Sequence, residues 1–146
     1  MTSPVVLCAP VRTPIGAYGG ALKDMKAPAL GSVAIAETLR RAGVGADNID
    51  SVVMGQVVQA GAKMNPARQA AINAGLRDSA PAMTVNRVCG SGAQAIASAA
   101  QEIMLGLGQA VIAGGMENMS LSPYVLPKAR TGLRMGHAQM LDSMIV

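Results

Sequence analysis

Short β-rich runs alternate with helical patterns along most of this chain, and no other feature of the sequence limits the fold as strongly. Gly or Pro residues stand at most of the junctions. The expected order is β-α-β-α-β-α-β, with strands at residues 5–10, 51–59, 82–86 and 110–113 and helices at residues 28–42, 66–75 and 92–107. Strands and helices that alternate in this way form a layered α/β domain, in which helices cover a largely parallel sheet.

Two of the expected helices have clear sequence signals at their ends. Pro28 opens the first, whose apolar residues recur at i, i+4 and i+7, and Gly43 stands where a helix C-cap belongs. Asn65 followed by Pro66 predicts the start of the second, because Asn caps helix N-termini and Pro is tolerated at the first helical position.

The core must be built without large aromatic side chains. The chain contains no Phe or Trp and only two Tyr, while 51% of it is hydrophobic, so Ala, Val, Ile, Leu and Met have to fill the interior. In the third expected helix, Ile96, Ala100, Ile103 and Leu107 share one stripe and Ala occupies most other sides. A helix that is apolar nearly all round is expected to be buried.

Charge and hydropathy argue against two classes of partner. The net charge is +4, but most basic residues are scattered and stacking aromatics are missing, so the sequence does not predict nucleic-acid binding. The longest apolar stretch, residues 93–116, is interrupted by Gln94, Gln101, Glu102 and Gln109, so no membrane span is expected. Two cysteines without a preceding signal peptide favour a reduced, cytoplasmic protein.

One short segment carries the strongest chemical signal. Between Asn86 and Gly92 a strand ends and a helix begins, and Cys89 lies in the turn between them. A turn of this kind presents a side chain at the end of a sheet, where α/β proteins build their sites. The helix N-terminus favours a thiolate, the glycines on either side leave room for a substrate, and the Cys89 amide is a candidate oxyanion-hole donor. From the residues alone, an ordinary buried thiol stays an open alternative.

Four blocks of the sequence, in order, resemble the thiolase family. The block around Cys89 is similar to the family's nucleophile signature, and the others are similar to its N-terminal loop, its second strand and helix, and its Gly-Gly-Met-Glu segment. The blocks are residues 85–95, 11–16, 55–57 with 65–70, and 113–120 with 123–124. The resemblance implies the N-terminal half of a thiolase-like layered α/β fold at residues 1–120, followed by the beginning of a loop domain at residues 121–146.

The resemblance also implies a reaction. In the family, the cysteine at the position of Cys89 attacks an acyl-CoA thioester and forms an S-acyl enzyme. A second acetyl-CoA loses an α-proton and its carbanion takes the acyl group to give acetoacetyl-CoA; the reverse direction is thiolytic cleavage. The coenzyme A thioesters are substrates, and neither a metal nor a redox cofactor is implied. The expected protein is a cytoplasmic acetyl-CoA C-acetyltransferase that assembles as a homotetramer, a dimer of dimers.

Several family motifs have no counterpart in this sequence. Thiolases are more than twice as long, and their second half carries Gly-His-Pro, Cys-x-Gly-Gly-Gly and Asn-Glu-Ala motifs that do not occur here. The chain is therefore expected to hold one catalytic group of at least three. The remaining C-terminal part of the enzyme is an expected partner, and residues 1–146 alone are expected to be inactive.

Other candidate residues have plainer interpretations. His137, the only histidine, lies in an irregular basic loop and is expected to be solvated rather than to serve as the missing base. Cys8 is expected in the core of a strand, and Glu117 is expected to be hydrogen-bonded scaffold. The basic cluster near the C-terminus is interpreted either as a solvated loop or as an oligomerisation loop, and it consists of Lys128, Arg130 and Arg134.

Two other functions compete with the leading one. Another condensing enzyme of the same fold, such as a ketoacyl synthase acting on carrier-protein thioesters, also places a cysteine at a helix start, but residues 114–120 argue against it. A non-catalytic half-domain that serves as a scaffold would associate through exposed apolar surface. A scaffold would not have a hyper-reactive Cys89, and this difference separates the two hypotheses.

Overall fold

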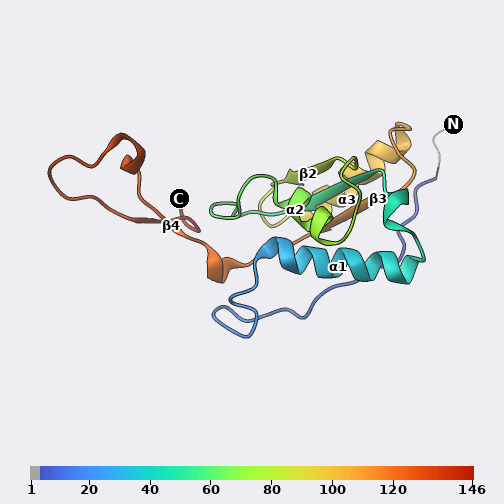
Figure 1. Ribbon diagram of the computed structural model, residues 1–146, viewed down its shortest axis with the longest axis horizontal. Coiled ribbons are helices and arrows are strands. Elements are labelled where there is room, and N and C mark those ends of the chain that lie inside the picture. Colours follow the sequence, from blue (N-terminus) through green and yellow to red (C-terminus); the bar gives the residue numbers. More distant parts are fainter. Residues whose placement is uncertain (1–3) are drawn as a thin grey trace.

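A sheet of three parallel strands forms the centre of the molecule (Figure 1). The computed structural model describes residues 4–146. In spatial order the strands are β2 (Ala82–Val85), β1 (Ser51–Gly55) and β3 (Val111–Gly115). Val53 in the central strand lies opposite Met83 on one side and Ala113 on the other. Parallel pairing of successive strands requires crossover connections, and the predicted helices supply them.

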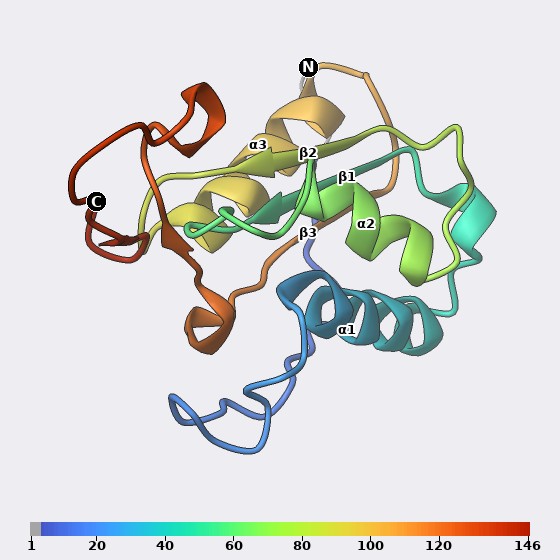
Figure 2. The same cartoon turned by 60° about the vertical axis from the view of Figure 1, so that its left-hand side comes forward.

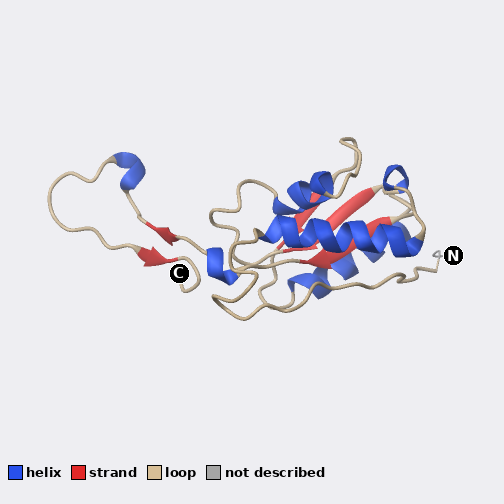
Figure 3. Cartoon of the chain, turned by 60° about the horizontal axis from the view of Figure 1, so that its bottom comes forward, coloured by secondary structure: helices blue, strands red, loops and turns tan. Residues whose placement is uncertain are grey.

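Helices cover both faces of this sheet (Figure 2). They are α1 (Ala27–Ala42), α2 (Pro66–Asn73) and α3 (Ser91–Met104), and a short helical turn, η1 (Ala46–Asn48), leads from α1 into β1. Side chains alternate along β1: Val52 and Met54 pack in the cluster with α1 and α2, whereas Val53 packs with α3. Figure 3 shows α1 lying across the sheet. The predicted layered α/β class is confirmed.

The predicted end signals of α1 and the predicted start of α2 are confirmed, whereas α2 ends at Asn73, two residues before the predicted end. Pro28 lies in the first turn of α1, and Gly43 ends the helix in the left-handed conformation, with φ +64°. At the start of α2, Pro66 occupies the first helical position and Asn65 is the N-cap. The Asn65 Oδ1 atom accepts a hydrogen bond from the Arg68 amide at 3.2 Å.

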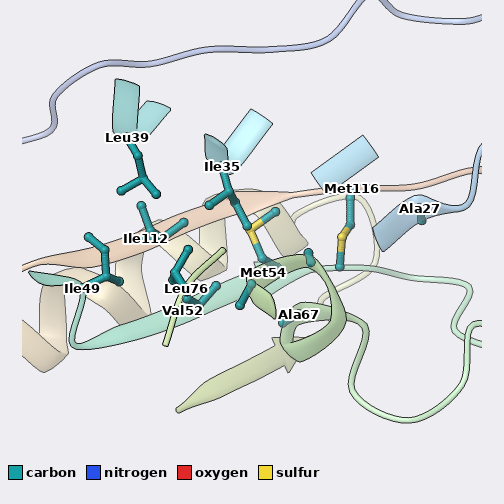
Figure 4. Packing of buried hydrophobic residues seen from close by; sticks show 12 residues of the cluster. Ala27, Ile35, Leu39, Ile49, Val52, Met54, Ala67, Leu76, Ile112 and Met116 are labelled. Carbon is teal, nitrogen blue, oxygen red and sulfur yellow. The ribbon is translucent and has the colours of Figure 1, made fainter. Parts of the chain in front are cut away.

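The main core lies between the sheet and helices α1 and α2 (Figure 4). It is aliphatic and Met-containing, as the composition predicts, and its buried members are Ala27, Ile35, Leu39, Ile49, Val52, Met54, Ala67, Ala70, Ala71, Leu76, Ile112 and Met116. Small residues bring its layers together. A Cβ added at Gly31 would lie 2.6 Å from Met116 Sδ and 3.2 Å from Ala70 Cβ. The glycine therefore lets α1 approach α2 more closely than any side chain would permit.

The strand expected at residues 5–10 is absent, so this prediction was wrong. Residues 4–17 form neither helix nor strand. Val6 and Leu7 are 79% and 76% exposed, and Cys8 is exposed instead of lying in a core. An apolar run becomes a buried strand only where a neighbouring strand accepts its hydrogen bonds. Within the described residues no strand pairs with this segment, and Ala9, with φ +49°, interrupts its extended backbone.

Helix α3 is less buried than its composition predicts. Its buried residues are Ser91, Ala95 and Ala99, whereas Ile96 is 39% exposed and Leu107, beyond the end of the helix, is 71% exposed. The sheet contacts the small side chains, because they allow close approach, and much of the expected apolar stripe stays exposed. Burial on all sides would need a second layer over α3, and the described residues do not form one.

The chain leaves the layered core after β3. A helical turn, η2 (Met119–Leu121), leads into residues 123–146, which we call the arm. The arm contains an antiparallel pair and one helical turn, namely β4 (Tyr124–Val125), β5 (Leu141–Asp142) and η3 (Ala129–Thr131). Figure 1 shows it extending away from the sheet. The division into domains at 1–120 and 121–146 stays a prediction. Among the described residues, no helix combines the length and apolarity that a membrane crossing requires.

Candidate active site

The three parallel strands end at one edge of the sheet, and the segments that follow them meet there. These segments are residues 56–59 after β1, 86–90 after β2 and 116–118 after β3. Backbone bonds join their first residues to neighbouring strand ends: Gln56 N–H donates to the Val85 carbonyl at 3.1 Å, and Met116 N–H donates to the Gly55 carbonyl at 3.0 Å. The carboxyl edge of a parallel sheet is where α/β proteins place their ligand sites.

Cys89 lies at this edge, in a tight turn between β2 and α3. Val88 before it has φ +49°, a conformation that β-branched residues rarely adopt. Ser91 braces the turn, because its Oγ accepts from the Arg87 amide at 2.8 Å and donates to the Val88 carbonyl at 2.6 Å. Gly90 N–H also donates to the Arg87 carbonyl at 3.0 Å. Cys89 is exposed, unlike the buried thiol that the sequence left open as an alternative.

The surroundings of Cys89 leave space and an available donor. Helix α3 begins two residues later, at Ser91, so Cys89 lies at a helix N-terminus, where the helix dipole favours negative charge. Among the described residues, none accepts a hydrogen bond from the Cys89 amide. A Cβ added at Gly92 would meet no atom within 4 Å. A thioester carbonyl therefore has both room to approach and a backbone N–H to meet.

Gly55 allows the start of α3 to lie directly against the end of β1. A Cβ added at Gly55 would lie 2.5 Å from the Ser91 carbonyl carbon and 2.8 Å from the Gly92 nitrogen. On the neighbouring strand, a Cβ at Gly115 would lie 3.4 Å from the Gly92 Cα. Glycines at two strand ends thus set the position of the turn that carries Cys89.

Two polar side chains connect the three segments. Asn86 donates from Nδ2 to the Val57 carbonyl at 3.1 Å and accepts at Oδ1 from the Val88 amide at 3.0 Å. Glu117 accepts at Oε2 from the Val57 amide at 2.8 Å and from the Val58 amide at 3.1 Å. Glu117 therefore braces the segment after β1 and not helix α3 itself. No role was expected for Asn86, although a polar residue directly after a strand was a usable signal.

The remaining candidates lie apart from this site. His137 and the basic cluster of Lys128, Arg130 and Arg134 are exposed on the arm, and no hydrogen bond or ion pair between side chains links them to another described residue. The exposed Cys8 lies in the irregular N-terminal segment. In the part of the chain that the structure describes, no group of three His, Cys, Asp or Glu side chains is arranged to hold a metal ion.

A groove of about 910 Å³ lies beside the site but does not include Cys89. It runs between the start of α1, the loop before α2 and the segment after η2, and Gln56, Lys63, Asn118 and Ser122 are among its lining residues. Gln56 Oε1 and Ser122 Oγ are buried without a hydrogen-bond partner among the described residues. Because Cys89 does not line this groove, we assign the groove no role in the chemistry of Cys89.

Asn118 and Ser120, which follow β3, connect the N-terminal loop to the core. Neither contact was predicted from the sequence. The Asn118 Nδ2 group, with two N–H donors, lies within hydrogen-bond distance of three carbonyls, including that of Met25 at 2.7 Å and that of Leu22 at 3.0 Å. Ser120 Oγ accepts from the Gly19 amide at 3.0 Å. These contacts join segments about ninety to one hundred residues apart, as their separations of 93, 96 and 101 show, and sequence patterns do not register such distant pairs.

Comparison with known proteins agrees with this geometry. Residues 5–146 match the family model described as "Thiolase, N-terminal domain". The chain is 53% identical to an acetyl-CoA acetyltransferase of Pseudomonas aeruginosa and 53% identical to one of Cupriavidus necator, in each case over 97% of this chain and 36% of the relative. The crystal structure of the Bacillus anthracis acetyl-CoA acetyltransferase superposes with a TM-score of 0.87 at 42% identity, over 92% of this chain and 34% of that one.

The family match extends over almost all of the described residues, and the fold agrees with it. The chain belongs to the thiolase family and corresponds to its N-terminal domain. It spans about a third of the length of the curated relatives that it matches.

Proposed function

We propose that this chain carries the acyl-accepting cysteine of an acetyl-CoA acetyltransferase. One observation carries the proposal: Cys89 is exposed at the start of α3, in a braced turn at the carboxyl edge of the sheet. An exposed thiol at a helix N-terminus is the environment in which cysteine acts as a nucleophile. The relatives are acetyl-CoA acetyltransferases, and they supply the substrate class of the proposal.

In the proposed first step, the Cys89 Sγ attacks the carbonyl carbon of acetyl-CoA. The carbon–sulfur bond to coenzyme A breaks, coenzyme A leaves as a thiol after taking up a proton, and the acetyl group stays on Cys89. The Cys89 amide donates a hydrogen bond to the carbonyl oxygen while that oxygen carries negative charge. In the second step, a deprotonated acetyl-CoA attacks the acetyl carbon, acetoacetyl-CoA forms, and Cys89 is released as a thiolate.

Both steps need proton acceptors that the described residues do not bring to Cys89. His137 lies on the arm, and Glu117 is engaged with the amides of Val57 and Val58. The proposal therefore assigns these acceptors to the portion of the relatives that this chain does not match. A cytoplasmic homo-oligomer remains the expected form of the complete enzyme, and the exposed apolar residues of α3, such as Ile96, suit an assembled protein.

The proposal is tested by acetyl transfer to the chain. The chain is incubated with acetyl-CoA, and its cysteine-containing peptides are analysed by mass spectrometry. We expect acetyl on Cys89 and little on Cys8, although both are exposed, because Cys8 lies in an irregular segment without a helix N-terminus. Cys89→Ser should abolish the labelling, since an unactivated hydroxyl is a poor nucleophile, and Cys8→Ser should leave it unchanged. Equal labelling of the two cysteines would refute the assignment.

Complete turnover requires a second measurement. The chain alone should not cleave acetoacetyl-CoA with coenzyme A, because catalytic groups that act as a unit lose nearly all activity when several are missing. Addition of the C-terminal two thirds of a relative, expressed as a separate polypeptide, is expected to produce thiolysis that depends on Cys89. Turnover by the chain alone at the rate of a complete relative would show that the site is not incomplete.

A further inference from the structure

Asn86 is the point at which the segment after β1 and the turn of Cys89 are joined. Its side-chain amide is used at both ends, with Nδ2 bonded to the Val57 carbonyl at 3.1 Å and Oδ1 bonded to the Val88 amide at 3.0 Å. One partner is an acceptor and the other is a donor, so the amide has a single orientation that satisfies both. Although Asn86 is exposed, this double contact fixes it between two backbone segments.

Val88 needs such support because its backbone is strained. A φ of +49° is rare for a β-branched residue, and strain of this kind persists only where the surroundings hold it in place. The Val88 amide is held by Asn86, and the Val88 carbonyl is held by Ser91 through its Oγ at 2.6 Å and its amide at 3.0 Å. The conformation of Val88 sets the direction in which the next residue, Cys89, leaves the turn.

Val57, whose carbonyl accepts the bond from Asn86, is itself held by a residue that follows β3. Glu117, two residues beyond β3, accepts at Oε2 from the amides of Val57 and Val58 at 2.8 and 3.1 Å. A continuous series of contacts therefore runs from Glu117 through Val57 and Asn86 to Val88 and ends beside Cys89. This series of hydrogen bonds joins the segments that follow all three strands. None of the bonds involves the Cys89 sulfur atom.

We infer that Asn86 is a positioning residue that maintains the reactivity of Cys89 by holding Val88 in its left-handed conformation, and that Glu117 acts through it. The inference rests on the proposed nucleophilic role of Cys89. Without the Asn86 amide, Val88 keeps only the bonds from Ser91 to its carbonyl, its amide is no longer held, and we expect its φ to relax toward negative values. The thiol then moves from its place at the start of α3, where the helix N-terminus and the free Cys89 amide act on it.

Cys8 provides an internal standard for the test. Both cysteines are exposed, so the rate of alkylation of Cys89 by iodoacetamide can be expressed as a ratio to that of Cys8 in the same molecule, across a range of pH. In Asn86→Ala we expect this ratio to fall on the order of tenfold, since small displacements of a reacting group have large effects on rate. Asn86→Asp keeps an oxygen for the Val88 amide but has no donor for Val57, and it should restore part of the ratio.

Asn65→Ala is the matched control. Asn65 also uses both ends of its amide, with Nδ2 bonded to the Ala82 carbonyl at 2.8 Å and Oδ1 accepting from the Arg68 amide at 3.2 Å, but it supports the start of α2. It should lower stability without changing the ratio of Cys89 to Cys8 labelling. All variants are compared at a temperature at which circular dichroism shows them folded.

The outcomes separate this inference from the proposed function. If the ratio in Asn86→Ala equals that of the unaltered chain, or if Asn65→Ala lowers it equally, Asn86 does not position the thiol. If the ratio falls as expected but the unaltered chain accepts no acetyl group from acetyl-CoA, the positioning role stands and the proposed acyl transfer fails. Acetyl transfer at an undiminished rate in Asn86→Ala would overturn the inference alone.

Discussion

Helices α1 and α2 cover one face of the sheet and helix α3 covers the other, and the two layers bury very different sets of side chains. The first layer encloses a cluster of twelve buried residues that includes Ile, Leu and Met side chains. The second encloses Val53, Ala95 and Ala99. Around α3, large apolar residues such as Ile96 and Met104 stay 39% and 48% exposed.

The difference shows that the two layers have different tasks. The α1–α2 layer supplies most of the apolar burial, which is the main favourable term in folding. The α3 layer contributes little burial, but it brings a helix N-terminus against the ends of β1 and β3 through Gly55 and Gly115. One layer stabilises the sheet, and the other places Cys89 at its edge.

The largest effect should come from removing a core side chain of the first layer. Ile35 is 2% exposed on α1, and Ile35→Ala should lower the free energy of unfolding by about 2–5 kcal/mol through lost burial and a new cavity. Ile96→Ala makes the same change on α3, where the side chain is 39% exposed, and should cost far less. Urea unfolding followed by circular dichroism measures both. Equal losses would mean that α3 is packed as tightly as α1.

A smaller effect is expected where α3 meets β1. Gly55→Ala places a Cβ 2.5 Å from the Ser91 carbonyl carbon and should cost about 1–3 kcal/mol, since the backbone has to shift. Gly92→Ala, at the second residue of α3, meets no atom within 4 Å and should stabilise α3 by up to about 1 kcal/mol. Urea unfolding curves of the two variants measure these changes in the free energy of unfolding. A neutral Gly55→Ala would show that the helix start is not in close contact with the strand.

A still smaller effect is expected at the turn between α3 and β3. Asp50 accepts from the Gln109 and Ala110 amides at 2.7 and 3.1 Å, and these bonds, with a contribution from nearby Arg77, lower the pKa of Asp50 below its ordinary value. Since the folded pKa is lower than the unfolded one, the stabilising contribution is complete above about pH 4 and is lost as the pH falls through the folded pKa. Asp50→Asn should therefore reduce stability at pH 7 and weaken its decline on acidification.

Glu37 is the matched control for that measurement. Hydrogen bonds from Arg40 and Arg41 lower the pKa of Glu37 to about 2, but the two arginine side chains are 71% and 54% exposed on α1. Salt screens such pairs, so Glu37→Gln should change stability little at physiological ionic strength. Urea midpoints between pH 7 and pH 3 provide the comparison. A larger effect at Glu37 than at Asp50 would contradict the assigned difference between an exposed pair and a backbone-bound carboxylate.

Local signals in the sequence determined a large part of the fold. Pro28, Gly43, Asn65 and Pro66 marked helix ends, because capping depends on residues that are adjacent in the chain. The alternation of β-rich and helical segments predicted the parallel sheet and placed Cys89 in a strand-to-helix turn. These features depend on contacts within a few residues, and the sequence displays them directly.

Tertiary structure decided the features that depend on distant partners. The run at residues 5–10 has the composition of a strand, but strand formation needs a neighbour, and the described residues provide none. The large apolar residues of α3 were expected to form its buried stripe. Instead, alanines of α3 pack against the sheet, because small side chains allow the helix to approach closely. Asn86 joins Val57 to Val88 across 29 residues, and no local pattern records such a pair. Sequence thus identified the candidate nucleophile, whereas the residues that hold its turn became visible only when three strand ends met at one edge of the sheet.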